Sequence, residues 1–157
     1  MKKPVNVLTH SDVPESRQTG YPQPFARDVA GRINRFLGES CGLTQFGVTL
    51  TRLEPGAWSS QRHWHENEDE FVYVLEGSPS LVTDEGERVL APGQFCAFPA
   101  GQANGHHLVN RTDRPAMFLA IGTCADRETV HYSDIDMVYR QEAPGSQGYY
   151  RRDGSRY

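Results

Sequence analysis

Short apolar stretches separated by turn signals run from residue 43 to residue 121. The breaks between them, such as Glu54-Pro55-Gly56, carry the residues that tight turns favour. Regular spacing of this kind is typical of an all-β sandwich or barrel. The pattern predicts strands over residues 45–53, 61–65, 70–75, 79–83, 87–90, 94–98, 106–110 and 116–121. Such a number of strands is enough for a jelly roll, so the expected fold class is all-β.

The two flanks of this region have weaker patterns. Prolines interrupt residues 1–42, and only residues 27–36 have the pattern of a short helix. We therefore expect residues 1–42 to form an N-terminal arm packed on a barrel core over residues 43–122. Residues 123–157 are expected to be a C-terminal extension, an extended tail whose last tyrosines dock it on the barrel or on a partner chain.

Charge and cysteine content narrow the classes of partner. The formal net charge is −4, so the protein as a whole repels a phosphate backbone and has no general attraction to an anionic membrane. Nucleic acid and membranes are therefore not expected as partners. No apolar run is long enough to span a bilayer, and polar residues stand where a signal peptide would be apolar. Three widely spaced cysteines give no paired framework, which favours a cytoplasmic location.

A metal-ligating pattern stands at His63-Trp64-His65. Alternate residues of a strand face the same side, so the two imidazoles can converge on one ion while Trp64 faces away. Glu70 lies five positions beyond His65, where a straight strand would direct it to the opposite face. The polar residues 66–69 must therefore form a turn or bulge that brings the carboxylate back beside the imidazoles.

A fourth donor is available in the Gly105-His106-His107 segment. Neighbouring side chains of a strand point to opposite faces, so only one of the two histidines can easily join the cluster. Periodicity alone does not decide between His106 and His107.

Residues 56–77, GAWSSQRHWHENEDEFVYVLEG, resemble the first motif of the cupin family, G-x5-H-x-H-x3,4-E-x6-G. Every metal-binding position of that motif is filled, by His63, His65 and Glu70. The one departure is a longer loop between Gly56 and the first histidine, which leaves the ligand spacing intact.

Residues 93–110, GQFCAFPAGQANGHHLVN, resemble the second cupin motif, G-x5-P-x-G-x2-H-x3-N. The gap before the histidine is longer than in the motif, whereas His106 and Asn110 keep the expected spacing. On this resemblance His106 is the preferred fourth ligand and His107 the second choice. A match without the longer gap would put Asn104 at the ligand position, and an amide is a poorer donor to a transition metal.

The resemblance to cupins implies a jelly-roll barrel, also called a double-stranded β-helix, with a metal site of three histidines and one glutamate. It also implies frequent dimers, but no single reaction. A homodimer is expected as well from the strand at residues 70–75, because both of its faces are apolar and need cover. Similar small single-domain cupins include proteins labelled sugar-phosphate isomerase, although function belongs to the site and not to the fold.

Four protein donors leave one or two positions open on a six-coordinate ion, which is typical of a catalytic rather than a structural site. The expected cofactor is one divalent transition metal: Fe, Mn, Ni, Co or Zn. The expected function is a metalloenzyme acting on a small oxygenated molecule, isomerase-like or dioxygenase-like. The alternative is a non-catalytic cupin that binds or senses a small molecule. The candidates to assist the chemistry, none of them with a diagnostic spacing, are Tyr73, Gln61, Arg62 and Gln94.

Overall fold

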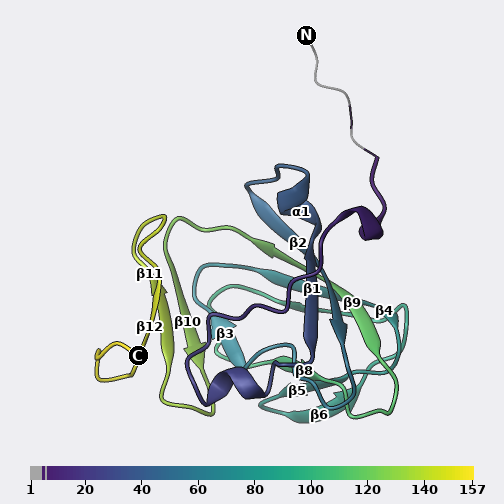
Figure 1. Ribbon diagram of the computed structural model, residues 1–157. Coiled ribbons are helices and arrows are strands. Elements are labelled where there is room, and N and C mark those ends of the chain that lie inside the picture. The colour runs from purple at the N-terminus through teal and green to yellow at the C-terminus, as the bar shows by residue number, and fades with distance from the viewer. Residues whose placement is uncertain (1–4, 6) are drawn as a thin grey trace.

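Antiparallel β-strands make up most of the regular secondary structure in this computed structural model, which describes Val5 and residues 7–157 (Figure 1). The largest sheet has the strand order β1-β2-β9-β4-β7. Its members are β1 (Arg32–Phe36), β2 (Phe46–Leu53), β9 (Ala116–Thr123), β4 (Glu70–Glu76) and β7 (Phe95–Phe98). A three-stranded sheet, in the order β6-β5-β8, consists of β6 (Gly86–Val89), β5 (Ser80–Thr83) and β8 (His107–Val109).

The barrel core lies between these two sheets. Val72 and Val74 of β4 are buried against Leu108 of β8, and Phe118 of β9 closes the same cluster. Burying an aliphatic side chain of this size contributes about 1.5–3 kcal/mol. Every strand predicted between residues 45 and 121 is present, with ends within two residues of those expected. The all-β jelly roll is therefore confirmed.

The prediction of a short helix over residues 27–36 is wrong. Phe25–Arg27 form a single 3-10 turn, η2, and the chain then enters β1, which pairs with β2 so that Ile33 lies opposite Arg52. Ile33 is buried, so the segment follows the two-residue alternation of a strand. The free edge of β2 offers β1 a full row of backbone hydrogen bonds, and this outweighs a weak helical pattern.

Two other short helical elements lie near the N-terminus, η1 (His10–Asp12) and α1 (Leu37–Ser40). Among the described residues, no helix is long and apolar enough to cross a membrane.

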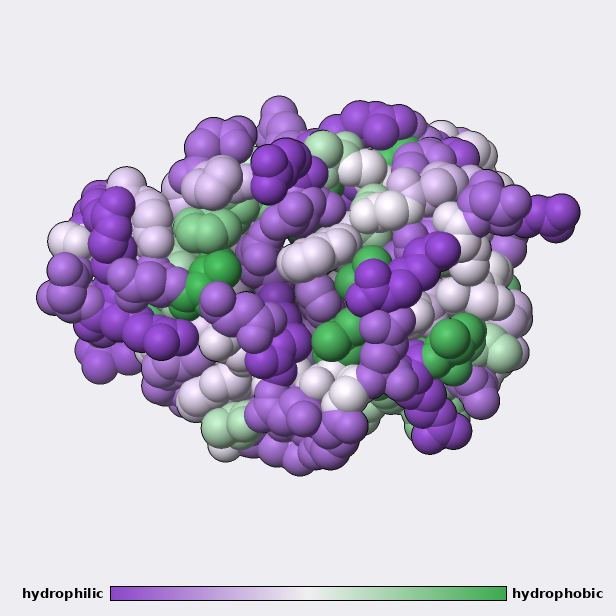
Figure 2. Space-filling view, turned by 90° about the horizontal axis from the view of Figure 1, so that it is seen from below, coloured by the Kyte–Doolittle hydropathy of each residue, from purple (hydrophilic) through white to green (hydrophobic). Residues whose placement is uncertain are grey.

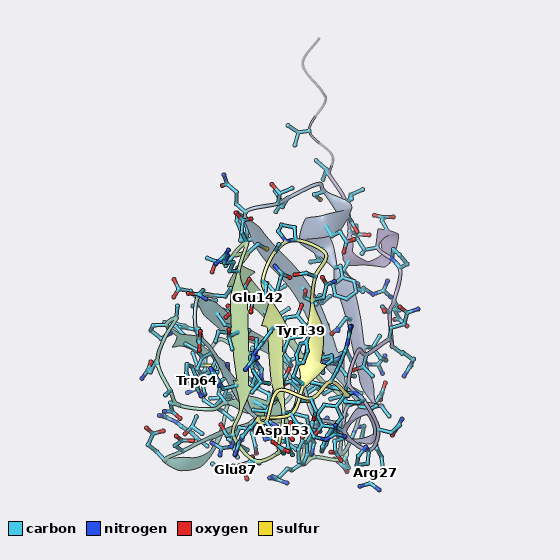
Figure 3. All side chains as sticks on the ribbon, turned by 90° about the vertical axis from the view of Figure 1, so that its left-hand side faces the viewer. Arg27, Trp64, Glu87, Tyr139, Glu142 and Asp153 are labelled. Atoms are coloured by element: carbon cyan, nitrogen blue, oxygen red, sulfur yellow. The ribbon has the colours of Figure 1, made fainter. Side chains whose placement is uncertain are left out.

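The C-terminal extension has more regular structure than its sequence suggests. It contains β10 (Glu128–Tyr132), β11 (Val138–Gln141) and β12 (Gly148–Tyr150), which lie side by side in Figure 3. These strands form a sheet in the order β12-β11-β10-β3, where β3 is His63–His65. The predicted extended tail is therefore a three-stranded addition, and it joins the barrel at the strand that carries two predicted metal ligands.

The added sheet has a hydrophobic core of its own. Val130, Tyr132 and Met137 are buried there, and Tyr21 from the N-terminal segment and Tyr149 from β12 pack against them. Both flanks of the chain thus meet beside β3.

Candidate metal centre

β3 directs His63 and His65 to the same side, as its two-residue alternation requires. On one side the strand pairs with β10, with His65 opposite Val130, and on the other an isolated bridge joins His63 to His106. The two Nε2 atoms of His63 and His65 lie 3.1 Å apart. Pairing on both sides therefore holds the two imidazoles together.

The turn predicted at residues 66–69 is present and returns the chain to β4. At its start the Glu66 N–H donates to the Thr129 carbonyl (3.0 Å), and at its end the Asp69 N–H donates to the Thr123 hydroxyl (2.9 Å). Glu70 opens β4, and its Oε2 lies 3.8 Å from His63 Nε2 and 3.7 Å from His65 Nε2. The turn thus brings the carboxylate to the imidazoles.

His106 is the histidine of its pair that joins this cluster. Its Nε2 lies 2.9 Å from Oε2 of Glu70, and its ring stacks on Phe98 with 3.5 Å between the ring centroids. Neighbouring His107 turns away, with its Nδ1 2.8 Å from the Ser60 carbonyl oxygen and its ring against Trp58. The structure therefore distinguishes His106 from His107, which strand periodicity alone does not do.

Asn104, the third candidate for the fourth ligand, points elsewhere. Its side-chain amide donates to the carboxylate of Glu85 at 2.9 Å and accepts the N–H of Asp84 at 3.0 Å.

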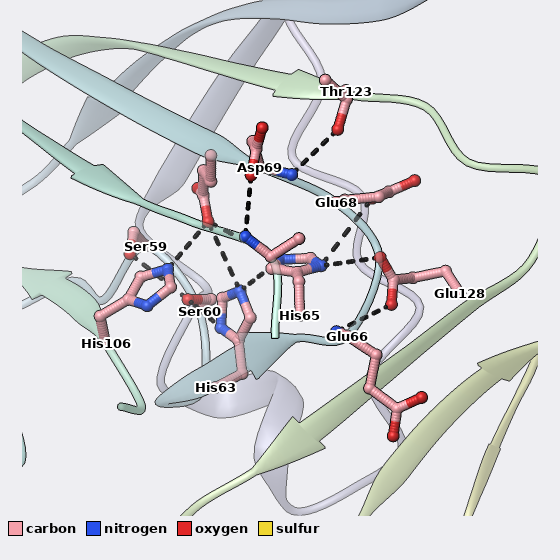
Figure 4. Close-up of polar contacts among 12 residues, drawn as sticks. Ser59, Ser60, His63, His65, Glu66, Glu68, Asp69, His106, Thr123 and Glu128 are labelled. Atoms are coloured by element: carbon pink, nitrogen blue, oxygen red, sulfur yellow. Dashed lines mark hydrogen bonds and ion pairs between the residues drawn. The ribbon is translucent and has the colours of Figure 1, made fainter. Parts of the chain in front are cut away.

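The separations between donor atoms fit a single small ion. Two ligands about 2.1 Å from an ion lie about 3.0 Å apart at right angles and about 4.2 Å apart on opposite sides. The four measured separations run from 2.9 Å to 3.8 Å. Figure 4 shows His63, His65 and His106 gathered together, and Oε2 of Glu70 lies within 3.8 Å of Nε2 of each. The donor set is therefore compatible with a divalent transition metal.

Burial and neighbouring charges keep His63 and Glu70 in their ligating forms. Burial lowers the pKa of His63 to about 3, so its imidazole is neutral near pH 7. Burial raises the pKa of Glu70, but the hydrogen bond from His106 and the nearby imidazoles outweigh it and lower the pKa to about 2. Metal binding needs neutral imidazoles and an ionised carboxylate, so little proton release opposes it here.

Backbone carbonyl groups orient two of the three imidazoles. His63 Nδ1 lies 2.8 Å from the Gln61 carbonyl oxygen, and His106 Nδ1 lies 3.4 Å from that of Asn104. A proton on Nδ1 that is donated to a carbonyl leaves the Nε2 lone pair free for an ion. These tautomers are assigned from the partners of each ring.

The cluster opens on a cavity of about 220 Å³ inside the barrel. Arg32 and Asn34 of β1 and Thr51 of β2 line it opposite the imidazoles. The Thr51 hydroxyl donates to Asn34 (2.9 Å), and the Arg32 guanidinium donates to the Ser59 carbonyl (2.6 Å). No carboxylate among the described residues forms an ion pair with Arg32. This part of the wall is therefore polar and carries the Arg32 guanidinium, whereas Val72, Leu108 and Phe118 line the cavity elsewhere.

Sequence reasoning missed Arg32, and the residues it proposed as assistants do not line this cavity. Gln61 is buried and donates to Asp28 (2.9 Å), whereas Arg62 pairs with Asp134 on the surface. Tyr73 lies on the outer face of β4, and Gln94 accepts a hydrogen bond in a turn. The signal for Arg32 was the alternation within residues 32–36, which puts Arg32 on the face opposite Ile33.

The comparison with known proteins agrees with this geometry. A family model described as "Cupin domain" matches residues 49–122. A crystal structure of a sugar phosphate isomerase of the cupin superfamily, from Silicibacter pomeroyi DSS-3, is 45% identical in sequence with a TM-score of 0.92, over 97% of this chain and 96% of that one. The chain belongs to the cupin superfamily. No curated protein matches it.

Two further cupin-like structures resemble this cupin over most of its length. One, described as a candidate sugar phosphate isomerase from Acidithiobacillus ferrooxidans, has 31% identity and a TM-score of 0.73 over 82% of each chain. The other is the polyketide cyclase RemF from Streptomyces resistomycificus, with 26% identity and a TM-score of 0.64 over 80% of this chain and 81% of that one. Similar barrels are thus associated with different reactions, so the site must carry the functional argument.

Proposed function

We propose that this cupin is a metal-dependent enzyme acting on a small oxygenated molecule, with one divalent transition ion held by His63, His65, Glu70 and His106. The observation that carries the proposal is the convergence of donor atoms from His63, Glu70 and His106 at the wall of one cavity, with Nε2 of His65 close behind them, 3.1 Å from His63 Nε2 and 3.7 Å from Glu70 Oε2. Fe, Mn, Ni, Co and Zn all suit a set of imidazoles with one carboxylate. An ion bound there supplies Lewis-acid polarisation of a substrate oxygen.

Arg32 suggests which substrates fit. Burial lowers the pKa of Arg32, and the titratable groups that act on it are the tyrosines Tyr21, Tyr149 and Tyr132 rather than carboxylates. A guanidinium presents paired N–H donors that match the oxygens of a phosphate or carboxylate. A cavity of about 220 Å³ holds only a small ligand. These residues favour a small molecule with an oxygen at the metal centre and an anionic group at Arg32.

Isomerase-like chemistry on a sugar phosphate satisfies these requirements. Such a substrate has a carbonyl or hydroxyl oxygen for the metal centre and a phosphate for Arg32. The relatives from S. pomeroyi and A. ferrooxidans are both described as sugar phosphate isomerases, the second as a candidate. Dioxygenase-like chemistry and non-catalytic binding or sensing are the outcomes that the experiment must separate from it.

The test begins with elemental analysis of protein purified without added metal, followed by assays of the metal-loaded protein. We expect one ion per chain and conversion of an aldose phosphate to a ketose phosphate. Oxygen uptake with diketone or phenolic substrates would replace the isomerase by a dioxygenase. Tight binding of a small molecule without conversion, in air and under nitrogen, would show a sensor.

Variants of two arginines test the substrate class. Arg32→Gln is expected to raise KM for a sugar phosphate while leaving the metal content unchanged. Arg52→Gln is the matched control, because Arg52 lies in the adjacent strand and pairs with Glu54 outside the cavity. Equal effects of the two variants would refute the role of Arg32.

We also propose that the protein is a homodimer. The face seen in Figure 2 is mostly hydrophilic, with hydrophobic residues separated from one another. On the outer side of β4 and β7, however, Tyr73 is 38%, Leu75 43% and Phe95 64% exposed. A second copy that covers this face would bury about 1,000 Å² or more. Light scattering should give twice the chain mass, and Phe95→Glu should shift it to a monomer.

The cytoplasmic location expected from the sequence remains a prediction.

A further inference from the structure

The geometry points to Glu128 as the positioning residue of His65, a carboxylate that holds this imidazole in its metal-binding orientation and tautomer. This inference rests on the proposed metal centre. Glu128 opens β10 in the C-terminal sheet, outside both cupin motifs. Figure 4 shows it beside His65, where it faces Nδ1, whereas Glu70 lies near Nε2 of the same ring.

The Glu128 side chain is only 3% exposed, yet one of its oxygens has no partner. Its Oε1 accepts three backbone N–H groups, from Glu66 (3.1 Å), Asn67 (3.2 Å) and Thr129 (2.6 Å). Its Oε2 faces Nδ1 of His65 across 3.6 Å and has no hydrogen-bond partner among the described residues. Three bonds to one oxygen thus fix the carboxylate and direct the other oxygen at the imidazole.

Nδ1 of His65 is the other buried atom that has no hydrogen-bond partner among the described residues. A buried polar atom left without a partner costs about 1–3 kcal/mol. When Nε2 ligates an ion through its lone pair, the proton of the neutral ring must reside on Nδ1. The Nδ1–H then needs an acceptor, and Glu128 Oε2 needs a donor. A small movement of the ring joins the two.

This arrangement sets His65 apart from the other two imidazoles. His63 and His106 each direct Nδ1 at a neutral backbone carbonyl oxygen. A carboxylate acceptor makes a stronger hydrogen bond and a more basic ligand, so His65 should bind the ion more strongly because of Glu128. Strand β10 thereby contributes to the metal centre without supplying a ligand.

Glu68 is the competing carboxylate, since its Oε2 lies 3.8 Å from the same nitrogen. It is less rigidly held, because only the Ala125 N–H at 2.8 Å bonds to it. The three side chains could also surround a second ion, but that would require removal of the Nδ1 proton while Nε2 binds the first. Of the two carboxylates, Glu128 is therefore the acceptor.

The experiment compares Glu128→Gln with its matched control, Glu68→Gln, in the full-length protein. Glutamine keeps the shape of the side chain and an oxygen for the three backbone donors, but turns an N–H₂ group toward Nδ1–H. Affinity for Zn²⁺ is measured by competition with a chelator, and melting of the metal-free protein is followed in parallel. We expect Glu128→Gln to weaken zinc binding about 10- to 100-fold, with Glu68→Gln close to wild type and both metal-free proteins folded.

Equal zinc affinity in wild type and Glu128→Gln would overturn the inference, as would an equal or larger loss in Glu68→Gln. Two zinc ions per wild-type chain, falling to one in both variants, would overturn it in favour of a second ion. If the wild-type protein binds no metal, the proposed function itself fails, and this result is distinct from the others.

A second measurement uses only the wild-type protein, so it tests the role of Glu128 even if Glu128→Gln does not fold. In the zinc-loaded wild type, NMR correlation of the imidazole nitrogens with their protons should show a slowly exchanging proton on Nδ1 of His65. Its resonance should lie at lower field than those of His63 and His106, because its acceptor is charged. An unprotonated Nδ1, or a proton that exchanges freely with water, would overturn the inference.

Discussion

The barrel and the C-terminal sheet contribute to the same centre in different ways. The barrel and β3 supply all four proposed ligands, at positions that two short sequence motifs specify. The C-terminal strands β10, β11 and β12 supply none of them, but β10 forms the ladder that holds β3, and Glu128 faces the back of His65. Ligand identity is thus encoded locally, whereas ligand orientation depends on a distant part of the chain.

Removal of a donor is expected to have the largest effect. Glu70→Ala should abolish metal binding and turnover together, because it takes away the single carboxylate that lies near all three imidazoles. Elemental analysis and the isomerase assay measure the two losses. Retention of a full equivalent of metal would show that Glu70 is not a ligand and would move the centre away from the barrel.

Two adjacent histidines offer a sharper contrast within the barrel. His106→Ala should weaken zinc binding by more than about 100-fold, the upper range for changes outside the ligand shell. His107→Ala should change it far less, because the His107 ring is held by Ser60 and Trp58 instead. Chelator competition measures both. A larger loss in His107→Ala would mean that the strand register differs by one residue.

The two regions also differ in how much of them could be predicted from the sequence. Between residues 43 and 121, apolar alternation and glycine-proline turns agree with each other, so strand positions follow. β10 has the sequence Glu-Thr-Val-His-Tyr, and its buried first residue is a glutamate. A charged residue normally indicates a solvent-facing position, and only pairing with β3, more than 60 positions away in the chain, buries this one.

The candidate site divides in the same way. His63, His65 and Glu70 follow from strand alternation and one turn, and motif spacing favoured His106. Glu128 gives no such signal, and the alternation that marks Arg32 is masked by the weak helical pattern of residues 27–36, because each of the two acts from a strand whose partner strand lies elsewhere along the chain. Local spacing therefore predicted the donor atoms, but not the residues that surround them.

A substitution that creates a cavity in the C-terminal hydrophobic core tests whether the barrel and the C-terminal strands unfold together. Met137→Ala should cost about 2–5 kcal/mol of unfolding free energy, because Met137 is fully buried. Met117→Ala, in the barrel but only partly buried, is the control and should cost less. We expect one cooperative transition in urea for both variants, since β10 and β3 share a ladder. Two separate transitions would show that the C-terminal sheet unfolds without the metal centre.

The smallest expected effect is a dependence of metal-free stability on pH. The folded-state pKa of His63 is lowered by burial to about 3, below its ordinary value of 6.5, so the unfolded chain binds this proton first as the pH falls. Stability should therefore decline from about pH 6.5 downward, by at most about 1.4 kcal/mol per pH unit for one proton. The pKa of Glu70, lowered from 4.5 to about 2, adds a loss of the same sign below about pH 4.5.

Urea unfolding of the metal-free protein between pH 7 and pH 5 isolates the histidine contribution. His63→Gln should flatten this slope, whereas His10→Gln, on the exposed 3-10 turn η1, should leave it as it is. An unchanged slope in His63→Gln would mean that the imidazole is hydrated in the metal-free protein. The barrel would then pack around His63 only when an ion is bound.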